Sequence, residues 1–302
     1  VGSAGFNGDG RDARKSQVSY PAGAAVAPDG SVIFADRSNH RVRKITTDFN
    51  IITIAGNGER GYTGDGGDAL FASLNFPTDV AVDDAGNVYI ADERNHVIRM
   101  VDTNGVITTI AGIGVAGFDG DTGTASSAQF ERPSGLALDG SILYVSDERN
   151  DRVRAINLDT GAMFTVAGNG TASTSADGEQ ADTQALISPR GLDVDSAGTI
   201  YIAELGGHKI RTVDASGVLG TVAGEGFSGF GGDGGPAVDA FLDQPMDVEV
   251  APSGDVIFTD MRNNRIRRID SGGTITTIAG TGAAAYSGDG GPAVDAALDT
   301  PW

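Results

Sequence analysis

Apolar and polar residues alternate with turn-forming residues in a pattern that the stretch 79–111 represents well. Four apolar runs, rich in Val and Ile, cover 79–82, 88–92, 97–101 and 106–111. Asp, Asn and Gly separate these runs, which is typical of short strands joined by hairpins. The stretch therefore predicts four antiparallel strands, called a, b, c and d in chain order.

This pattern returns with a constant step of 56 residues. Six prolines keep the step: Pro21, Pro77, Pro133, Pro189, Pro245 and Pro301. Repeated sets of four antiparallel strands predict an all-β fold, a β-propeller of four-stranded blades with five blades in this chain.

The repeat also predicts the domain organisation. We expect one propeller domain over residues 1–302, with units starting near 21, 77, 133, 189 and 245. Residues 1–20 and 281–302 are equivalent inter-blade loop segments. Two arrangements agree with this pattern, because closure removes exposed strand edges: a closed five-bladed ring, or part of a six-bladed one.

The connection from each strand d to the next strand a is long enough to carry structure of its own. Residues 234–242 predict a short helical turn, with Pro236 at the first helical position and Asp239 near the positive end of the helix dipole. An apolar residue three positions before each proline should anchor this turn on the blades. These residues are Val18, Leu74, Phe130, Leu186, Leu242 and Leu298.

Composition excludes several partners and chemistries. The 302 residues include 41 acidic and 21 basic side chains, a net charge of −20, which disfavours nucleic acid and anionic membranes. There is no apolar run long enough for membrane insertion. The absence of cysteine excludes disulfides, zinc ribbons and thiol nucleophiles. An acidic chain with few lysines suits a secreted protein, a marine or saline habitat or calcium-rich surroundings, and composition alone does not separate these. We expect an extracellular, cell-surface or periplasmic location.

Recurring motifs resemble those of a known family. The segments VIFADRSNHRVRKIT and VYIADERNHVIRMVD, and loops such as GYTGDGGDA, resemble the NHL-repeat β-propellers, in particular secreted bacterial NHL proteins and the teneurin NHL propeller. The resemblance implies a fold that is typically six-bladed and mostly used for binding. It also implies an enzymatic alternative, because some related six-bladed propellers are lyases or hydrolases.

All three histidines, His40, His96 and His208, occupy the same position in the turn between strands b and c. Three histidines could indicate zinc. However, equivalent turns of different blades diverge from one another. We therefore expect these histidines to have a structural role.

Two sets of charged residues recur in every unit. Strand b ends with an acidic residue, and strand c carries an arginine early in its run. Because these positions are neighbours across a tight hairpin, we expect an ion pair within each blade. The acidic residues are Asp36, Asp92, Asp147, Glu204 and Asp260, and the arginines are Arg43, Arg99, Arg154, Arg211 and Arg267.

A further aspartate recurs beside a glycine in each long loop: Asp9, Asp65, Asp121, Asp177, Asp233 and Asp289. Such residues could be calcium ligands, but calcium needs about six oxygen ligands. These loops offer one constant carboxylate each. We expect turn formation and hydrogen bonds to local backbone N–H groups instead.

Positions that break the repeat are the candidates for a site. On strand a, small residues give way to Asp79, Asp193, Asp247 and Glu249, which would place carboxylates beside a central channel. Arg190 could neutralise one of them. We predict a channel-mouth ligand site from these five residues, binding a basic ligand group or, through the four carboxylates, Ca²⁺ or another divalent cation. The alternative is a solvated channel with incidental charge.

Three functions agree with the sequence. The first is a non-catalytic recognition scaffold whose loop face binds a protein or glycan ligand, since no nucleophile–base set is present and no catalytic residue is identified. The second is an axial-metal-dependent hydrolase or lyase that uses the channel carboxylates. The third is a structural module of a larger surface protein. The sequence does not assign an oligomeric state.

Overall fold

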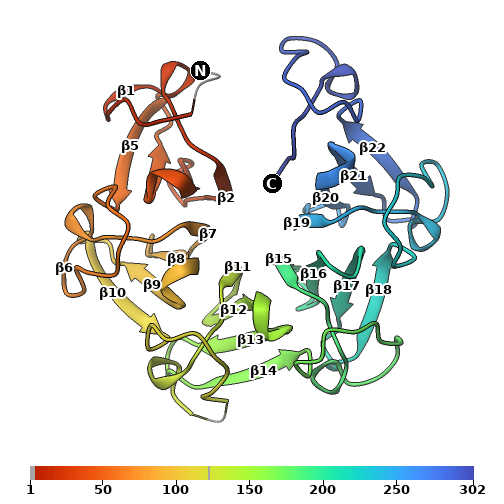
Figure 1. Cartoon of the computed structure of the whole chain (residues 1–302), viewed down its shortest axis with the longest axis horizontal. Helices are drawn as coiled ribbons and strands as arrows, with labels where there is room; N and C mark the ends of the chain where they lie inside the picture. The colour runs from red at the N-terminus through yellow and green to blue at the C-terminus, as the bar shows by residue number, and fades with distance from the viewer. Residues whose placement is uncertain (1–3, 122) are drawn as a thin grey trace. The chain divides into compact units, whose positions relative to one another are not determined.

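In the computed structural model, which describes residues 4–121 and 123–302, five antiparallel sheets follow one another along the chain (Figure 1). The chain divides into two compact units. The first unit comprises Val1–Val145 and Ala155–Phe164, and the second comprises Ser146–Arg154 and Thr165–Trp302. The prediction of one domain over residues 1–302 stays a prediction.

The first unit holds two complete sheets. The first sheet consists of β2 (Pro21–Val26), β3 (Val32–Asp36), β4 (Arg41–Ile45), β5 (Asn50–Ala55) and the short β1 (Arg11–Asp12), which pairs with β5. The second consists of β7 (Pro77–Val82), β8 (Val88–Asp92), β9 (Val97–Val101), β10 (Val106–Ala111) and the short β6 (Gly67–Asp68), which pairs with β10.

The third sheet has residues in both units, and the second unit holds the last two sheets. The third sheet consists of β11 (Pro133–Asp139), β12 (Ile142–Asp147), β13 (Arg152–Asn157) and β14 (Met163–Ala167). The fourth consists of β15 (Pro189–Val194), β16 (Ile200–Glu204), β17 (Lys209–Val213) and β18 (Leu219–Ala223). The fifth consists of β19 (Pro245–Val250), β20 (Val256–Asp260), β21 (Arg265–Ile269) and β22 (Ile275–Ala279).

These sheets confirm the predicted fold class, a β-propeller of four-stranded antiparallel blades with five blades in this chain. In the second blade, strands b, c and d have the predicted bounds, and strand a begins at Pro77, two residues before the predicted start. The extra pairing of Pro77 with Asp92 is separated from the rest of the ladder by a register shift, which an apolar pattern does not reveal.

Short 3₁₀ helices connect the strands. Those between strands b and c are η2 (Arg37–Asn39), η4 (Glu93–Asn95), η6 (Glu148–Asn150) and η9 (Met261–Asn263). Those in the long d-to-a loops are η1 (Ala13–Lys15), η3 (Ala69–Phe71), η5 (Ala125–Ser127), η7 (Ala181–Thr183), η8 (Ala237–Asp239) and η10 (Ala293–Asp295).

The helical turn predicted at 234–242 is one turn of 3₁₀ helix, and the predicted position of Pro236 was wrong. Pro236 is the residue before the helix, with an extended backbone (φ −61°, ψ 131°). The helix that follows, Ala237–Asp239, contains three residues, so too few N–H groups are aligned for the expected α-helical start. The anchoring role of the preceding apolar positions is confirmed where burial is complete, at Leu74, Phe130, Leu186 and Leu242.

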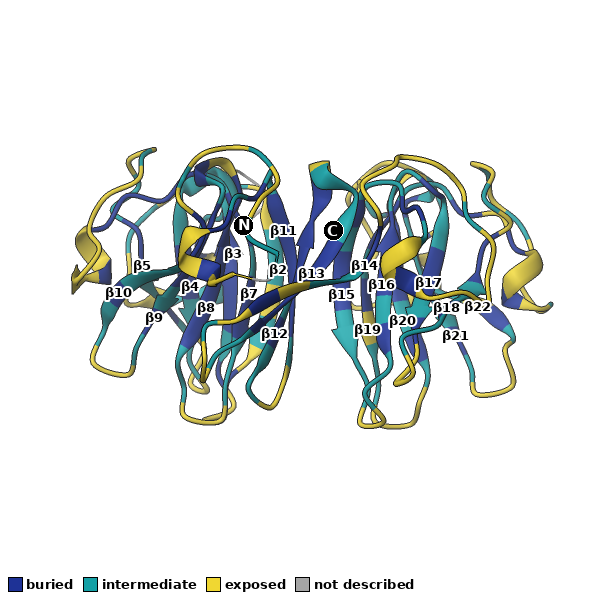
Figure 2. Cartoon of the chain, turned by 90° about the horizontal axis from the view of Figure 1, so that it is seen from below, coloured by how far each residue is buried: buried dark blue, intermediate teal, exposed yellow. Residues whose placement is uncertain are grey.

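Apolar side chains on the strands form the core of each unit. In the first unit one cluster includes Ile90 and Val42, and another includes Leu143 and Val145. In the second unit the core includes Phe258. Buried residues follow the strands and exposed residues the connecting loops (Figure 2). This is expected because backbone polar groups of loops are best satisfied by water.

Candidate functional site

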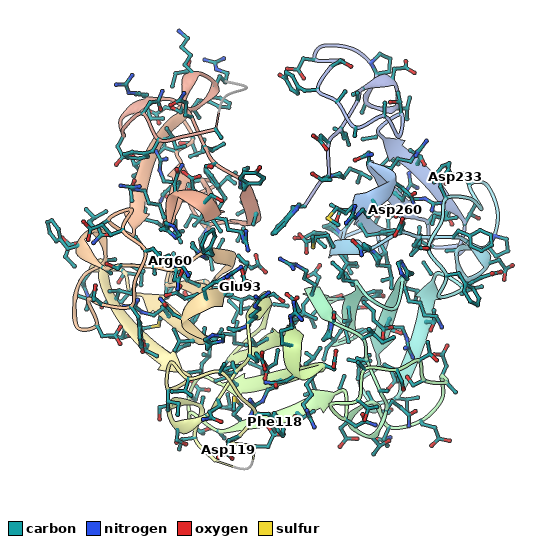
Figure 3. The ribbon with its side chains drawn as sticks, in the orientation of Figure 1. Arg60, Glu93, Phe118, Asp119, Asp233 and Asp260 are labelled. Carbon is teal, nitrogen blue, oxygen red and sulfur yellow. The ribbon has the colours of Figure 1, made fainter. Side chains whose placement is uncertain are left out.

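A fully buried arginine on strand c joins two acidic residues of its blade. In the fifth blade, Arg267 bonds Asp260 Oδ2 at 3.3 Å and Asp233 Oδ1 at 2.7 Å. Asp260 also accepts hydrogen bonds from the Asn263 side chain and from the backbone N–H of Asp243. Burial raises the pKa of Asp260, and these donors oppose that rise. Figure 3 labels Asp233 and Asp260 in this blade.

The same ion pairs recur along the chain and confirm the predicted pairing of strands b and c. The distances are 3.1 Å for Arg43–Asp36, 3.7 Å for Arg99–Asp92, 3.4 Å for Arg154–Asp147 and 3.3 Å for Arg211–Glu204.

The Gly-Asp loop residues differ from the prediction. Instead of serving mainly local backbone groups, four of them pair with the buried arginines: Asp9 with Arg43, Asp65 with Arg99, Asp177 with Arg211 and Asp233 with Arg267. The reason is that each buried guanidinium has donors beyond those used by strand b. The loops are thereby tied to their blades.

The turn between strands b and c ends in each blade with a left-handed residue, φ 50 to 58°. Its side chain accepts a hydrogen bond from the backbone N–H of the residue that precedes the proline of the next unit. We call this contact the turn-to-proline bond. The acceptor–donor pairs are His40–Phe76 (3.2 Å), His96–Arg132 (3.2 Å), Asp151–Ser188 (2.8 Å), His208–Gln244 (3.1 Å) and Asn264–Thr300 (2.9 Å).

These bonds confirm the structural role predicted for the histidines. His, Asn and Asp are the side chains that most readily adopt left-handed backbone, and each also carries an acceptor. The donor residues, such as Phe76 and Arg132, have positive φ as well, although a following proline favours extended backbone. The turn-to-proline bond therefore holds a strained residue in place.

We expect His96→Ala to lower the free energy of unfolding by about 1 kcal/mol, because the N–H of Arg132 loses its acceptor. His96→Asn should lower it less, since Asn264 fills the same role in the fifth blade. Urea denaturation of the two variants tests this. Equal losses in both would contradict it.

The same bond makes stability depend on pH. Burial lowers the pKa of His40 and His96 below their ordinary 6.5. The folded chain then binds fewer protons than the unfolded chain, so this contribution is complete above about pH 6.5 and is lost as the pH falls. A double His40→Asn, His96→Asn variant should lose less stability between about pH 7.5 and about pH 5 than the unchanged protein. Urea midpoints at both pH values measure it.

Three predicted site residues meet in the second unit. Asp193 lies on β15, and Asp247 and Glu249 lie on the adjacent β19. Asp193 accepts the N–H of Val194 at 2.8 Å and that of Val250 at 2.7 Å. Asp193 therefore serves as a link between two neighbouring strands, a role that the sequence did not indicate.

Burial raises the pKa of Asp193, Asp247 and Glu249, so the three carboxyl groups do not all ionise at neutral pH. Loss of hydration raises the pKa of Glu249 to about 8, and repulsion from Asp193 and Asp247 adds to this rise. At neutral pH the protonated Glu249 donates a hydrogen bond to Asp193. Burial also raises the pKa of Asp247. A proton is thus held between two carboxyl groups.

Arg190 makes its direct contacts with residues other than these three carboxyl groups. Its guanidinium bonds Glu148 Oε2 at 3.1 Å and stacks on the ring of Trp302 at 4.6 Å. Its charge still lowers the pKa of Asp247, but as a smaller effect than burial. The nearly buried Glu148 takes the direct contact because an unpaired carboxylate there would be costly.

Asp79 lies on β7 in the first unit. Its carboxylate accepts the N–H of Val80 at 2.8 Å and that of Leu136, on β11, at 2.8 Å. Gly23 allows this close approach, since a Cβ at that position would lie 1.8 Å from Asp79 Oδ1. Asp79 thus joins strands of consecutive blades, as Asp193 does in its own unit.

Within residues 4–121 and 123–302, no group of three or more His, Asp or Glu side chains has the arrangement of a metal site. In the same part of the chain, no helix is long and apolar enough to cross a membrane. The predicted channel-mouth site and its Ca²⁺ or other divalent cation stay predictions.

Comparison with known proteins identifies the family. The sequence profile of the teneurin NHL domain matches residues 47–116 and 165–228, and that of the NHL repeat matches residues 18–45. The chain belongs to the NHL-repeat β-propeller family.

This NHL propeller has relatives among much longer proteins. It is 30% identical to teneurin-1 of Mus musculus over 289 residues, which cover 79% of this chain and 10% of teneurin-1. It is 29% identical to SUPPRESSOR OF QUENCHING 1, chloroplastic, of Arabidopsis thaliana over 267 residues, covering 83% of this chain and 25% of that protein. The chain spans a quarter or less of the length of both relatives.

A solved structure of a Bacteroides thetaiotaomicron protein of unknown function shares the fold of this NHL propeller. The TM-score is 0.69 at 18% sequence identity, and the match covers 99% of this chain and 66% of that one. At this identity the likeness concerns the fold alone.

The NHL propeller also carries a group of residues that the sequence analysis missed. Four arginines lie around Phe76 and Glu93 in the first unit, and we call them the arginine cluster: Arg37, Arg60, Arg94 and Arg132. They come from turns between strands b and c and from d-to-a loops. Figure 3 labels Arg60 and Glu93. Arg37, Arg60 and Arg132 break the repeat, so a search for such residues extended beyond strand a would have found these three. Arg94 does not break it, because Arg149 and Arg262 hold the equivalent position.

Proposed function

We propose that this NHL propeller is a non-catalytic recognition scaffold that binds a protein or glycan ligand through the loops at one end of its blades. The distribution of exposed apolar side chains carries the proposal. Among the described residues, all but three of the exposed large apolar side chains lie in the d-to-a loops. Exposed apolar surface that gathers in this way is typical of interaction sites.

Examples occur in both units. Phe71 in the first unit is 76% exposed, and Phe227 and Tyr286 in the second are 68% and 79% exposed. Side chains of this size gain free energy when a partner covers them. Their presence in the loops of a highly acidic chain supports a binding role for the loops.

The loops are held firmly at the end of the blades where strand b turns into strand c. In the first unit the side chain of Asn95 donates to the carbonyl of Gly61 at 2.7 Å, and in the second that of Asn263 donates to Gly229 at 2.7 Å. Such bonds reduce the entropy that a loop loses on binding. They support the expectation that loops and turns form one surface within each unit.

Binding arrays test this function. We expect the intact chain to bind a ligand on a peptide or glycan array, and substitution of an exposed loop residue, such as Phe71→Ser or Phe227→Ser, to weaken binding about tenfold. Phe164→Ser is the matched control, because Phe164 is an exposed phenylalanine too, at 46%, but lies on β14 and not in a loop. Loss of binding in the control with none in any loop variant would contradict the proposal.

The cation site at the channel-mouth carboxylates is a separate proposal. The proton shared by Glu249 and Asp193 supports it, because a bound divalent cation would displace that proton and remove the repulsion between the carboxylates. Calcium should then raise the melting temperature and release protons. An unchanged melting temperature and no bound metal in the purified protein would contradict it. The hydrolase or lyase alternative depends on the same site.

We also propose an extracellular, cell-surface or periplasmic location, in which the chain could form a module of a larger protein. The net charge of −20 and the similarity to teneurin-1 support this. Fractionation of the native host cells tests it, and recovery in the cytosol would contradict it.

A further inference from the structure

The arginine cluster breaks the repeat at several positions. In the d-to-a loops, the positions equivalent to Arg60 hold Ala116, Ser228 and Ala284. A scaffold role would recur in every blade, as that of the buried arginines does. Arg94 recurs as Arg149 and Arg262. Arg37, Arg60 and Arg132 do not recur, so they need an explanation that applies to one place on the molecule.

Phe76 lies at the centre of the cluster. The guanidinium carbons of Arg37, Arg94 and Arg60 lie 5.0, 5.2 and 5.7 Å from the centre of its ring. His40 contacts the same ring edge-on, with 4.6 Å between the ring centres. These distances are within the range of cation–π attraction, so one half-buried ring gathers three positive charges.

Glu93 shows how the cluster binds a carboxylate. It is 2% exposed and bonds Arg37 through Oε2 at 2.7 Å. The Nε atoms of Arg94 and Arg132 lie 3.9 Å from its other oxygen, beyond hydrogen-bond distance. Glu93 therefore attracts these two guanidiniums without using their donors.

The donors of Arg94 and Arg132 are accessible. Their side chains are 38% and 32% exposed, and no side-chain hydrogen bond forms from either to any described residue. Arg60 is exposed as well. Glu59 and Glu131 adjoin the cluster in sequence and reduce its net charge, so recognition would depend on directed donors more than on the overall field.

We infer that the arginine cluster is a binding site for an acidic segment of a protein partner, whose carboxylates pair with Arg94, Arg132 and Arg60 beside the ring of Phe76. This inference rests on the proposed recognition function and names its ligand chemistry. Arginine matches a carboxylate with two parallel N–H donors. The positive field of Arg60 and Arg37 contributes to the lowered pKa of His40, in addition to burial.

The charge of the whole chain favours a short acidic segment over a long polyanion. A net charge of −20 repels nucleic acid or a sulfated polysaccharide along its full length. A segment with a few carboxylates meets less of this repulsion, since salt screens charges beyond about 8 Å at physiological ionic strength. The cluster can therefore dominate its binding.

Fluorescence anisotropy with a labelled hexaglutamate peptide and the full chain tests the site. We expect Arg94→Ala with Arg132→Ala to weaken binding about tenfold. The control is Arg149→Ala with Arg262→Ala, which removes the same charge from the equivalent turns of the third and fifth blades. It should leave the affinity within about twofold. Equal losses in both double variants would overturn the inference.

A second pair of variants changes only exposed side chains, which limits the effect on folding. Arg60→Glu and Arg149→Glu reverse the charge of exposed side chains, and only the first should abolish binding. Absence of hexaglutamate binding at about 1 mM, or about tenfold tighter binding of heparin or single-stranded RNA, would overturn the inference. If array ligands still bound and their binding still depended on the apolar loop residues, the proposed recognition function would stand without this inference.

Discussion

Arg267→Ala should lower the free energy of unfolding by about 3–5 kcal/mol, because it removes one member of a buried charge network. Arg267 is fully buried and bonds two carboxylates, Asp260 and Asp233. It also donates to the carbonyl oxygens of Phe241 and Gly231, both at 2.9 Å. Without it, Asp260 would remain buried as an uncompensated carboxylate.

The neighbouring residue provides the control. Arg268 lies on the same strand, but its side chain is 42% exposed and pairs with Asp255 at 3.0 Å. We expect Arg268→Ala to cost about 1 kcal/mol or less, since exposed ion pairs contribute little. Urea denaturation followed by circular dichroism compares the two variants. Similar urea midpoints for both variants would show that burial of the network does not determine its contribution to the free energy of unfolding.

Gly191→Ala should destabilise the second unit by about 1–3 kcal/mol through overpacking. A Cβ at Gly191 would lie 2.2 Å from Asp247 Oδ1 and 2.5 Å from Asp247 Cα. The side chain could rotate away, but the backbone atom could not move without shifting β19. Strands β15 and β19 must separate to accept even one methyl group.

Thermal unfolding of Gly191→Ala measures this effect, with Gly235→Ala as the control. Gly235 lies in the loop before η8, and a Cβ there would meet its nearest atom, the carbonyl oxygen of Gly232, at an ordinary 3.4 Å. We expect a lower melting temperature for the first variant and little change for the second. A Gly191→Ala protein as stable as the unchanged one would mean that the two strands are not in close contact.

The fold could be predicted from the sequence because one pattern is written five times. A single run such as 88–92 is ambiguous, but five runs at the same step of 56 residues reinforce one another. Turn residues with left-handed backbone were also predictable as turns, since His, Asn and Asp recur at the position of His96.

The candidate site was only partly predictable. The sequence identifies the strand-a carboxylates but not their partners, because Asp79 bonds a backbone N–H that lies 57 residues away. The Gly-Asp residues raise the same difficulty: Asp65 meets Arg99 only after the loop has folded back over 34 residues. A backbone N–H is the same in nearly every residue, so the sequence does not mark it as a partner. The path of a loop depends on how it packs against the folded blade.

The arginine cluster illustrates a different limit. Arg37 and Arg132 are 95 positions apart by their numbers, and each has an unremarkable sequence neighbourhood. Their shared contact with Glu93 becomes visible only when consecutive blades are packed together. Comparison of every repeat position, and not of strand a alone, would have identified them as exceptions.

The turn-to-proline bonds, and the hydrogen bonds that Asp79 and Asp193 accept from the next blade, determine how such a chain can change in length. A turn-to-proline bond joins residues 36 positions apart in His96–Arg132 and 37 in Asp151–Ser188, and the link from Asp193 to Val250 spans 57. Each contact joins one blade to the next, and none of them depends on the total number of blades. A duplicated segment of 56 residues would carry both the donor and the acceptor of each of these contacts. Evolution or design can therefore add a blade without any new kind of contact.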